Sequence, residues 1–66
     1  MNNISEEVIY LKKIVAERAK EAPEETKYEE FHRLGIFNGL EWALSKAEGR
    51  EPVFSRMQEM KEYKGE

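Results

Sequence analysis

The sequence predicts an all-α protein, built as an antiparallel hairpin of two long helices followed by a short C-terminal helix. Apolar residues recur at three- and four-residue steps through two long stretches, the spacing of amphipathic helices. Capping residues precede each stretch, and glycine or proline follows it. With 66 residues and no cysteine, the chain forms a single domain over residues 1–66, with a small core and no disulfide. Folds of this size commonly gain stability by oligomerisation, so we expect a dimer or a higher helical bundle.

The first helix is predicted over residues 4–22. Asn3 and Glu6 match the capping-box pattern at its start. Its apolar stripe consists of Ile4, Val8, Leu11, Val15, Ala19 and Ala22. Arg18 falls on the same stripe, where its aliphatic stem can lie along the core, whereas Lys12 falls on the polar side. This pattern predicts an amphipathic helix with one face toward a partner helix.

The second helix is predicted over residues 26–48. Pro23 cannot continue the hydrogen-bond ladder of the first helix, so the chain turns there. Thr26 and Glu29 offer a capping box, and Gly49 can take the left-handed conformation that closes a helix. Because the turn between the two long helices is short, we expect them to lie antiparallel.

A short third helix is predicted over residues 56–63. Ser55 and Gln58 repeat the capping pattern at its start, and Met57 and Met60 share one of its sides. Two positions are open to this helix, on its own hairpin or on a neighbouring chain.

Apolar side chains cover most of the circumference of the second helix, in two neighbouring stripes. The first stripe contains Tyr28, Phe31, Gly35, Gly39 and Trp42. The second contains Ile36, Leu40, Ala43, Leu44 and Ala47. The remaining polar strip, which we expect to face solvent, consists of Glu30, Glu41, Ser45 and Glu48, flanked by Leu34 and Phe37. One hairpin partner covers one stripe, so we expect a second chain on the other.

Gly35 and Gly39 stand in the middle of this helix, where a glycine costs about 1 kcal/mol relative to alanine. Close approach of another helix is the expected reason for them. Two arrangements are open: contact with Ala16 and Ala19 of the first helix, or contact with a second copy. The predicted interface consists of Tyr28, Phe31, Gly35, Ile36, Gly39, Leu40, Trp42 and Ala43.

Composition argues against several classes of partner. The net charge is −3, and charged residues of both signs are interspersed over 38% of the chain, so we expect binding to neither nucleic acid nor membranes. No stretch approaches the ~20 apolar residues of a membrane span, and the first residues lack the basic region of a signal peptide. We therefore expect a cytoplasmic protein.

Few residues suit catalysis. The chain offers one histidine, no cysteine and few hydroxyl groups, most of them at helix caps, so we expect no enzymatic activity and no cofactor. Glu29 and His32 have the Glu-x-x-His spacing of metal sites in helical bundles, although a surface ion pair is the commoner role of such residues. A metal-binding bundle is therefore a lesser alternative.

Arginine side chains and aromatic rings favour another alternative, a nucleotide site where the chains of an oligomer meet. Guanidinium groups pair with phosphates, and aromatic rings stack on bases. The candidate residues for such a site are Tyr10, Arg18, Arg33 and Arg50.

The pattern Gly-x-x-Asn-Gly-Leu-Glu at residues 35–41, followed by Glu-Gly-Arg-Glu-Pro at residues 48–52, resembles small helical proteins encoded by tailed bacteriophages and prophages. The likeness covers residues 31–54. It implies a context, the cytosol of a bacterial host, where short phage proteins bind and inhibit host factors, including immune components, or sequester nucleotide signals. The leading hypothesis is thus a non-enzymatic helical oligomer that binds and inhibits or modulates a host protein. A protein that sequesters a nucleotide signal is the alternative.

Overall fold

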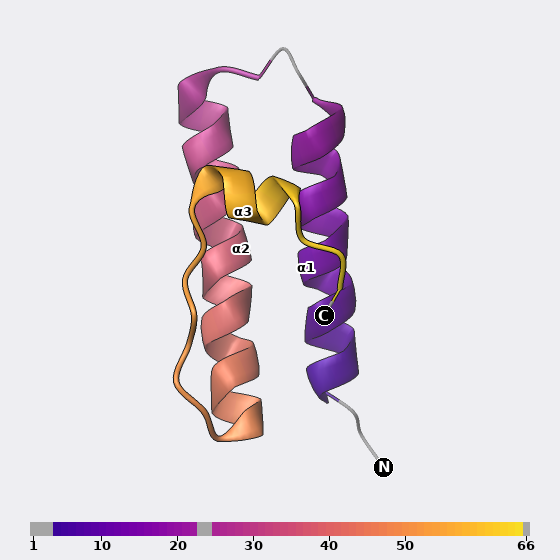
Figure 1. Cartoon of the computed structure of the whole chain (residues 1–66), viewed down its shortest axis with the longest axis vertical. Coiled ribbons are helices and arrows are strands. Elements are labelled where there is room, and N and C mark those ends of the chain that lie inside the picture. Colours follow the sequence, from indigo (N-terminus) through magenta and orange to yellow (C-terminus); the bar gives the residue numbers. More distant parts are fainter. Residues whose placement is uncertain (1–3, 23–24, 66) are drawn as a thin grey trace.

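The computed structural model describes residues 4–22 and 25–65, which form three helices. Helix α1 spans Ile4–Glu21, α2 spans Lys27–Glu48 and α3 spans Met57–Lys61. The two long helices lie side by side and antiparallel, and α3 crosses both of them (Figure 1). The predicted all-α fold, a helical hairpin with a short third helix, is confirmed.

The ends of the long helices follow the predicted caps closely. Helix α1 ends one residue before the predicted end, at Glu21, and α2 begins at Lys27 because Thr26 is its N-cap. The capping box is confirmed: the Glu29 N–H donates to the Thr26 hydroxyl at 3.1 Å, and the Thr26 N–H donates to the Glu29 carboxylate at 2.8 Å. Gly49 closes α2 with a φ of 67°. The predicted cap at Asn3 and the turn at Pro23 lie outside the described residues.

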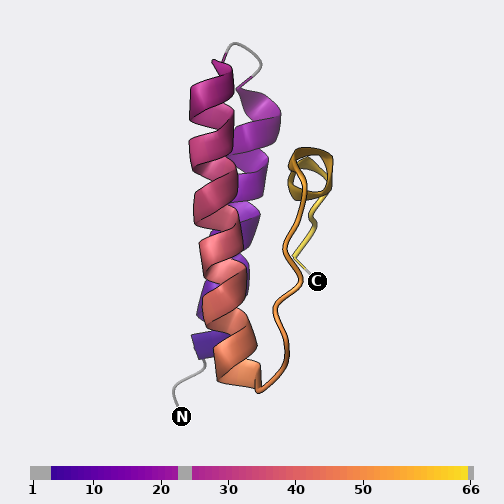
Figure 2. The same cartoon turned by 90° about the vertical axis from the view of Figure 1, so that its left-hand side faces the viewer.

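Helix α3 is shorter than the predicted range 56–63, and its predicted cap at Ser55 is wrong. Arg56 is the N-cap residue, and its N–H donates to the carboxylate of Glu59 at 2.7 Å. Ser55 binds α2 instead, and its N–H donates to the side-chain oxygen of Asn38 at 2.8 Å. The helix lies on its own hairpin, with the residues that follow it on the same side (Figure 2).

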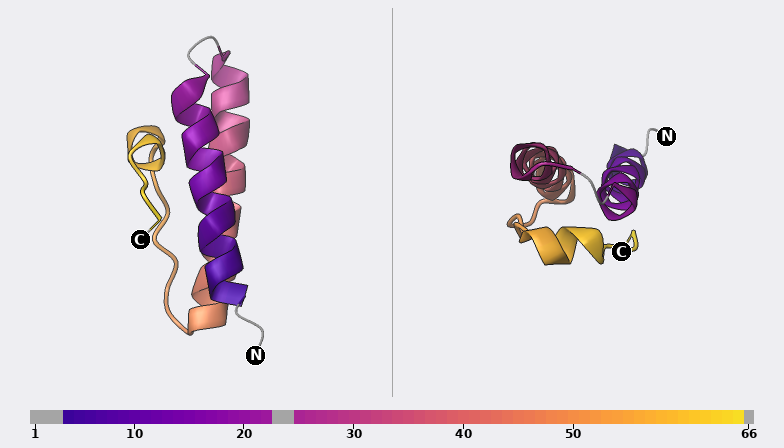
Figure 3. Two further views of the ribbon diagram at one scale, coloured as in Figure 1. Left: turned by 90° about the vertical axis from the view of Figure 1, so that its right-hand side faces the viewer. Right: turned by 90° about the horizontal axis from the view of Figure 1, so that it is seen from above.

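The core lies where α3 meets the hairpin. Met60 and Ala16 are fully buried, and Phe37 and Ala19 complete the cluster. The ring of Tyr63 packs edge-on against Phe37, with 5.1 Å between the ring centroids. Seen from above, α3 spans the seam between α1 and α2 (Figure 3). No helix in the described part of the chain combines the length and apolarity that crossing a membrane requires.

The face that α2 turns toward α1 is not one of the predicted stripes. Its buried residues are Phe37, Glu41, Leu44 and Ser45, which we call the inner face of α2. The polar strip predicted to face solvent is therefore partly buried, and Glu41 is only 2% exposed. Lys12, predicted on the polar side of the first helix, is 5% exposed, because its Nζ donates to Glu41 Oε1 at 2.8 Å. The two charges compensate each other in a place where either alone would be unfavourable.

Candidate interaction surface

A buried carboxylate on the inner face of α2 fastens three segments together. Glu41 accepts hydrogen bonds from Lys12 of α1 at 2.8 Å, from Arg50 beyond α2 at 2.7 Å, and from the Val53 N–H at 2.8 Å. The ammonium of Lys12 also lies 4.9 Å from the centroid of the Phe37 ring. These contacts fix the segment between α2 and α3 against the hairpin.

The charges around Glu41 also set its protonation. Hydrogen bonds from Arg50, and then from Lys12 and the Val53 N–H, hold the pKa of Glu41 at about 2, although burial acts in the opposite direction. The ordinary value is 4.5, so the carboxylate stays ionised well into the acidic range.

A second polar contact holds the same segment further along α2. The side chain of Asn38 accepts from the Ser55 N–H at 2.8 Å and donates to the Ser55 carbonyl at 3.1 Å. Residues 50–56 therefore run alongside α2 before α3 begins (Figure 1).

A groove of about 500 Å³ lies between the hairpin and this segment. Ile9, Leu44 and Val53 supply apolar walls, and Lys12 and Arg50 are its cations. Both cations are already bound to Glu41, so the groove presents no uncompensated positive charge to an anionic ligand.

The opposite side of α2 carries large apolar side chains that no described part of the chain covers. Tyr28 is 80% exposed, Phe31 63% and Trp42 56%. We call these residues, with Gly35 and Gly39, the outer face of α2. A methyl group built on either glycine would meet no side chain or neighbouring element within 4 Å. The interpretation that these glycines make room for Ala16 and Ala19 of α1 is therefore wrong.

The predicted interface residues divide between two surfaces. Five of them form the outer face, whereas Ile36, Leu40 and Ala43 lie on a neighbouring side of the helix. Ile36 is 45% exposed, Leu40 is half-buried and Ala43 is exposed. A partner on the outer face therefore leaves much of this second surface open.

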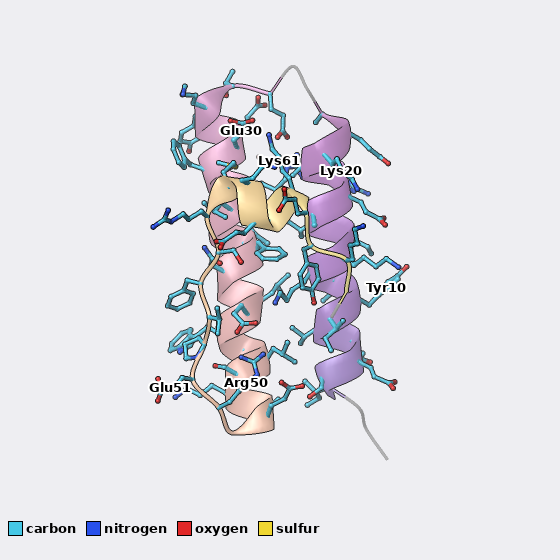
Figure 4. The ribbon with its side chains drawn as sticks, viewed as in Figure 1. Tyr10, Lys20, Glu30, Arg50, Glu51 and Lys61 are labelled. Atoms are coloured by element: carbon cyan, nitrogen blue, oxygen red, sulfur yellow. The ribbon has the colours of Figure 1, made fainter. Side chains whose placement is uncertain are left out.

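The candidate nucleotide-binding residues are not gathered in one place. Arg50 is held by Glu41 and Glu48, and Arg33 forms an ion pair with Glu25. Arg33 lies in the second turn of α2 and Arg50 just beyond its C-terminal end, and the helix from Arg33 to Glu48 alone is about 22 Å long. Tyr10 points outward from α1, while Arg50 lies at the far end of α2 (Figure 4). Arg18 is exposed on α1.

Glu29 and His32 border a shallow depression of about 250 Å³ at the start of α2, together with Tyr28 and Ile36. The carboxylate of Glu29 is occupied by the capping box with Thr26. Among the described residues, no three metal-capable side chains come together.

Two exposed apolar residues escaped the sequence analysis. Val53 is 72% exposed and Phe54 is 60% exposed, in the segment fastened by Glu41 and Asn38. Two consecutive apolar residues directly after a proline, outside any amphipathic helix, were the signal available in the sequence.

Neither models of known protein families, nor curated protein sequences, nor solved structures gave a match to this chain.

Proposed function

We propose that the protein is a non-catalytic helical binding protein that acts in the cytosol of a bacterial host and inhibits or modulates a host protein. The outer face of α2 is the surface through which it binds. The observation that carries the proposal is the exposure of Tyr28, Phe31 and Trp42 around two uncovered glycines. The resemblance to small phage proteins supports the host context.

The composition of the outer face suits a protein partner. Aromatic side chains are enriched at the energetic centres of protein interfaces, where they offer large contact areas with few rotatable bonds. Gly35 and Gly39 lie between Phe31 and Trp42 in the sequence of this face and have open space where a side chain would begin, a gap that we call the notch. The backbone of another helix can therefore approach α2 closely there.

The contacts of the arginines favour a protein partner over a nucleotide. Arg33 and Arg50 are each neutralised by carboxylates of the same chain, and a phosphate would have to displace them.

Two hydroxyl groups of α2 and its cap have structural roles, which supports a non-catalytic protein. Thr26 caps α2, and Ser45 is buried and donates to the Trp42 carbonyl at 2.6 Å.

A binding experiment with matched variants tests the proposal. The tagged protein is immobilised and exposed to a bacterial lysate, and the retained proteins are quantified by mass spectrometry. In the double variant Phe31→Ser and Trp42→Ser we expect the affinity for the partner to fall by roughly 700-fold and its retention to be lost, since interface aromatics of this kind contribute about 2 kcal/mol each. Tyr10→Ser removes an aromatic side chain of similar exposure from α1 and is expected to retain the partner.

Equal loss of the partner in the Tyr10 variant would contradict a site on the outer face. A second arm of the experiment measures the melting temperature in the presence of cyclic di- and trinucleotides. We expect no stabilisation; a rise that depends on Arg18 would instead support the nucleotide-sequestering alternative.

A further inference from the structure

A second exposed apolar surface lies on the side of the hairpin that faces away from α3. On α2, Ile36 and Leu40 are each two residues from Asn38, which binds Ser55. Because two residues turn a helix by 200°, both point to nearly the opposite side from the α2–α3 segment. Figures 2 and 3 show α3 and its flanking segments on one side of the hairpin only.

Helix α1 also has an apolar residue that lies two positions from residues facing the α3 side. Leu11 is two residues from Ile9, which lines the groove beneath the α2–α3 segment, and two from Lys13, whose side chain lies against Gly65. Leu11 therefore points away from α3 as well. We call this shared surface of α1 and α2 the back face of the hairpin. Its apolar residues are Ile4, Leu11, Ile14, Ile36, Leu40, Ala43 and Ala47.

The back face holds large aliphatic side chains that the core of one chain does not use. Ile4 is 51% exposed, Leu11 46% and Ile36 45%, while Ile14 and Leu40 are half-buried. Among the described residues, the apolar side chains larger than alanine that are fully enclosed are Val8, Phe37, Leu44 and Met60. The back face thus carries five large aliphatic side chains, against four enclosed apolar side chains in the core, which is a strong reason for it to be covered.

The dimensions of the back face fit a stable dimer. The molecule measures 40 × 20 × 15 Å, and the view in Figure 1 is down the shortest of these axes. The side of the hairpin away from α3 therefore extends over at most 40 × 20 Å, which leaves room for the ~800 Å² that each partner of a stable complex buries.

The charges on the back face of α1 are self-complementary. Glu7, Leu11, Ile14 and Arg18 follow one another at steps of four, three and four residues, so they share one stripe of the helix. Both charged residues are exposed. The midpoint between Glu7 and Arg18 coincides with the midpoint between Leu11 and Ile14. If two copies of α1 cross antiparallel at this point, each glutamate faces an arginine and each leucine faces an isoleucine.

We infer that a second copy of this chain covers the back face, with the two α1 helices antiparallel and centred between Leu11 and Ile14. In this arrangement Leu11 packs on the partner's Ile14, and Glu7 pairs with the partner's Arg18. Each contact occurs twice, as a two-fold axis requires. Ile36 and Leu40 add the second helix of each hairpin, so the dimer is a four-helix bundle with both α3 helices on its outside.

The oligomeric state tests the arrangement directly. Sedimentation equilibrium of the wild type at micromolar concentration is expected to give twice the 7.8 kDa mass of the chain. Leu11→Glu places a charge at the centre of the seam and is expected to give a folded monomer with unchanged helix content by circular dichroism. A monomeric wild type would overturn the inference, and so would a dimer that is unaffected by this substitution.

Charge exchange tests the antiparallel register and does not depend on removing an apolar side chain. Glu7→Arg or Arg18→Glu alone creates two like-charge contacts per dimer, and each is expected to weaken the dimer about tenfold at low salt. The double variant restores both pairs with their signs exchanged, and its dissociation constant is expected to return close to that of the wild type. If the double variant is weaker than both single variants, the register is wrong.

These outcomes are independent of the proposed partner site. Substitutions at Phe31 and Trp42 are expected to leave the mass of the dimer unchanged, because the outer face is not part of the back-face seam. A dimer lost in the Phe31 and Trp42 variants and kept in Leu11→Glu would place the second copy on the outer face instead.

Discussion

At the scale of single residues, the carboxylate of Glu41 connects three separate segments of the chain by hydrogen bonds. It binds a lysine from α1, an arginine from beyond α2 and a backbone amide of the following segment. Paired charges inside a protein contribute little net stability, but removal of one member leaves the other desolvated and unpaired. Glu41 therefore determines where the α2–α3 segment lies more than how stable the hairpin is.

Neutralising this carboxylate is expected to be costly. Glu41→Gln keeps the shape of the side chain but leaves Lys12 buried without its counter-charge, so we expect the free energy of unfolding to fall by about 3 kcal/mol. Glu48→Gln is the matched control, because Glu48 pairs with the same Arg50 at a site where its side chain is 36% exposed. That change is expected to cost less than about 1 kcal/mol. Urea unfolding measures both, and equal losses would contradict the assigned role of Glu41.

Acid is expected to destabilise the fold through the same group. The pKa of Glu41 is about 2 in the folded protein and close to the ordinary 4.5 in the unfolded chain, so the unfolded chain binds the proton more readily. The stabilisation of the fold by the ionised Glu41 is complete above about pH 4.5 and is lost as the pH falls toward 2. Melting temperatures measured from pH 7 to pH 2 should fall through this window.

The Glu41→Gln variant should show a shallower fall over the same window. Part of the fall should remain, because Arg33 also lowers the pKa of Glu25. A variant whose acid profile matches that of the wild type would show that other carboxylates govern the acid response.

At the scale of helices, α2 buries two polar residues, Glu41 and Ser45, on its inner face and leaves three aromatic residues exposed on its outer face. Its caps depend on neighbours in sequence, and they predicted both ends of the helix to within one residue. Its orientation depends on Lys12, which is 29 residues from Glu41, and no local pattern contains that pairing. The caps therefore predicted the extent of α2 correctly, whereas the hydrophobic pattern assigned Glu41 to solvent and did not identify Phe37 as a core residue.

The two mid-helix glycines allow a test in which stability and binding change in opposite directions. Gly35→Ala and Gly39→Ala are each expected to raise the free energy of unfolding by about 1 kcal/mol, since the added methyl group meets no neighbour. The same changes fill the notch of the outer face and are expected to weaken binding of the partner.

Gly49→Ala serves as the control for these substitutions. Its φ of +67° is unfavourable for alanine, so a loss of about 1 kcal/mol is expected in urea unfolding. A loss of stability at Gly35 or Gly39 would mean that another part of the assembled protein already occupies the notch.

At the scale of the whole molecule, the sequence predicted the hairpin and the presence of a third helix. It left open where α3 lies, because that position depends on the burial of Met60 beside Phe37 and on the bonds between Asn38 and Ser55. The candidate site was predicted in part: the exposed aromatic residues of α2 were named, whereas Val53 and Phe54 were not assigned to a surface. Ile4 and Leu11 were assigned to the face of the first helix that meets its partner helix, but both are exposed on the back face.

The burial of Met60 has a consequence for the order in which the protein can fold during synthesis. Helices α1 and α2 can pair once residue 48 has been made, but Phe37 lacks the part of its cover that Met60 and Tyr63 supply until those residues follow. An incomplete chain thus exposes the centre of its own core, a condition that promotes aggregation of nascent chains. Lys12 lies 4.9 Å from the centroid of the Phe37 ring and pairs with Glu41 of the same hairpin, so a charged group can stand beside Phe37 before α3 has been made.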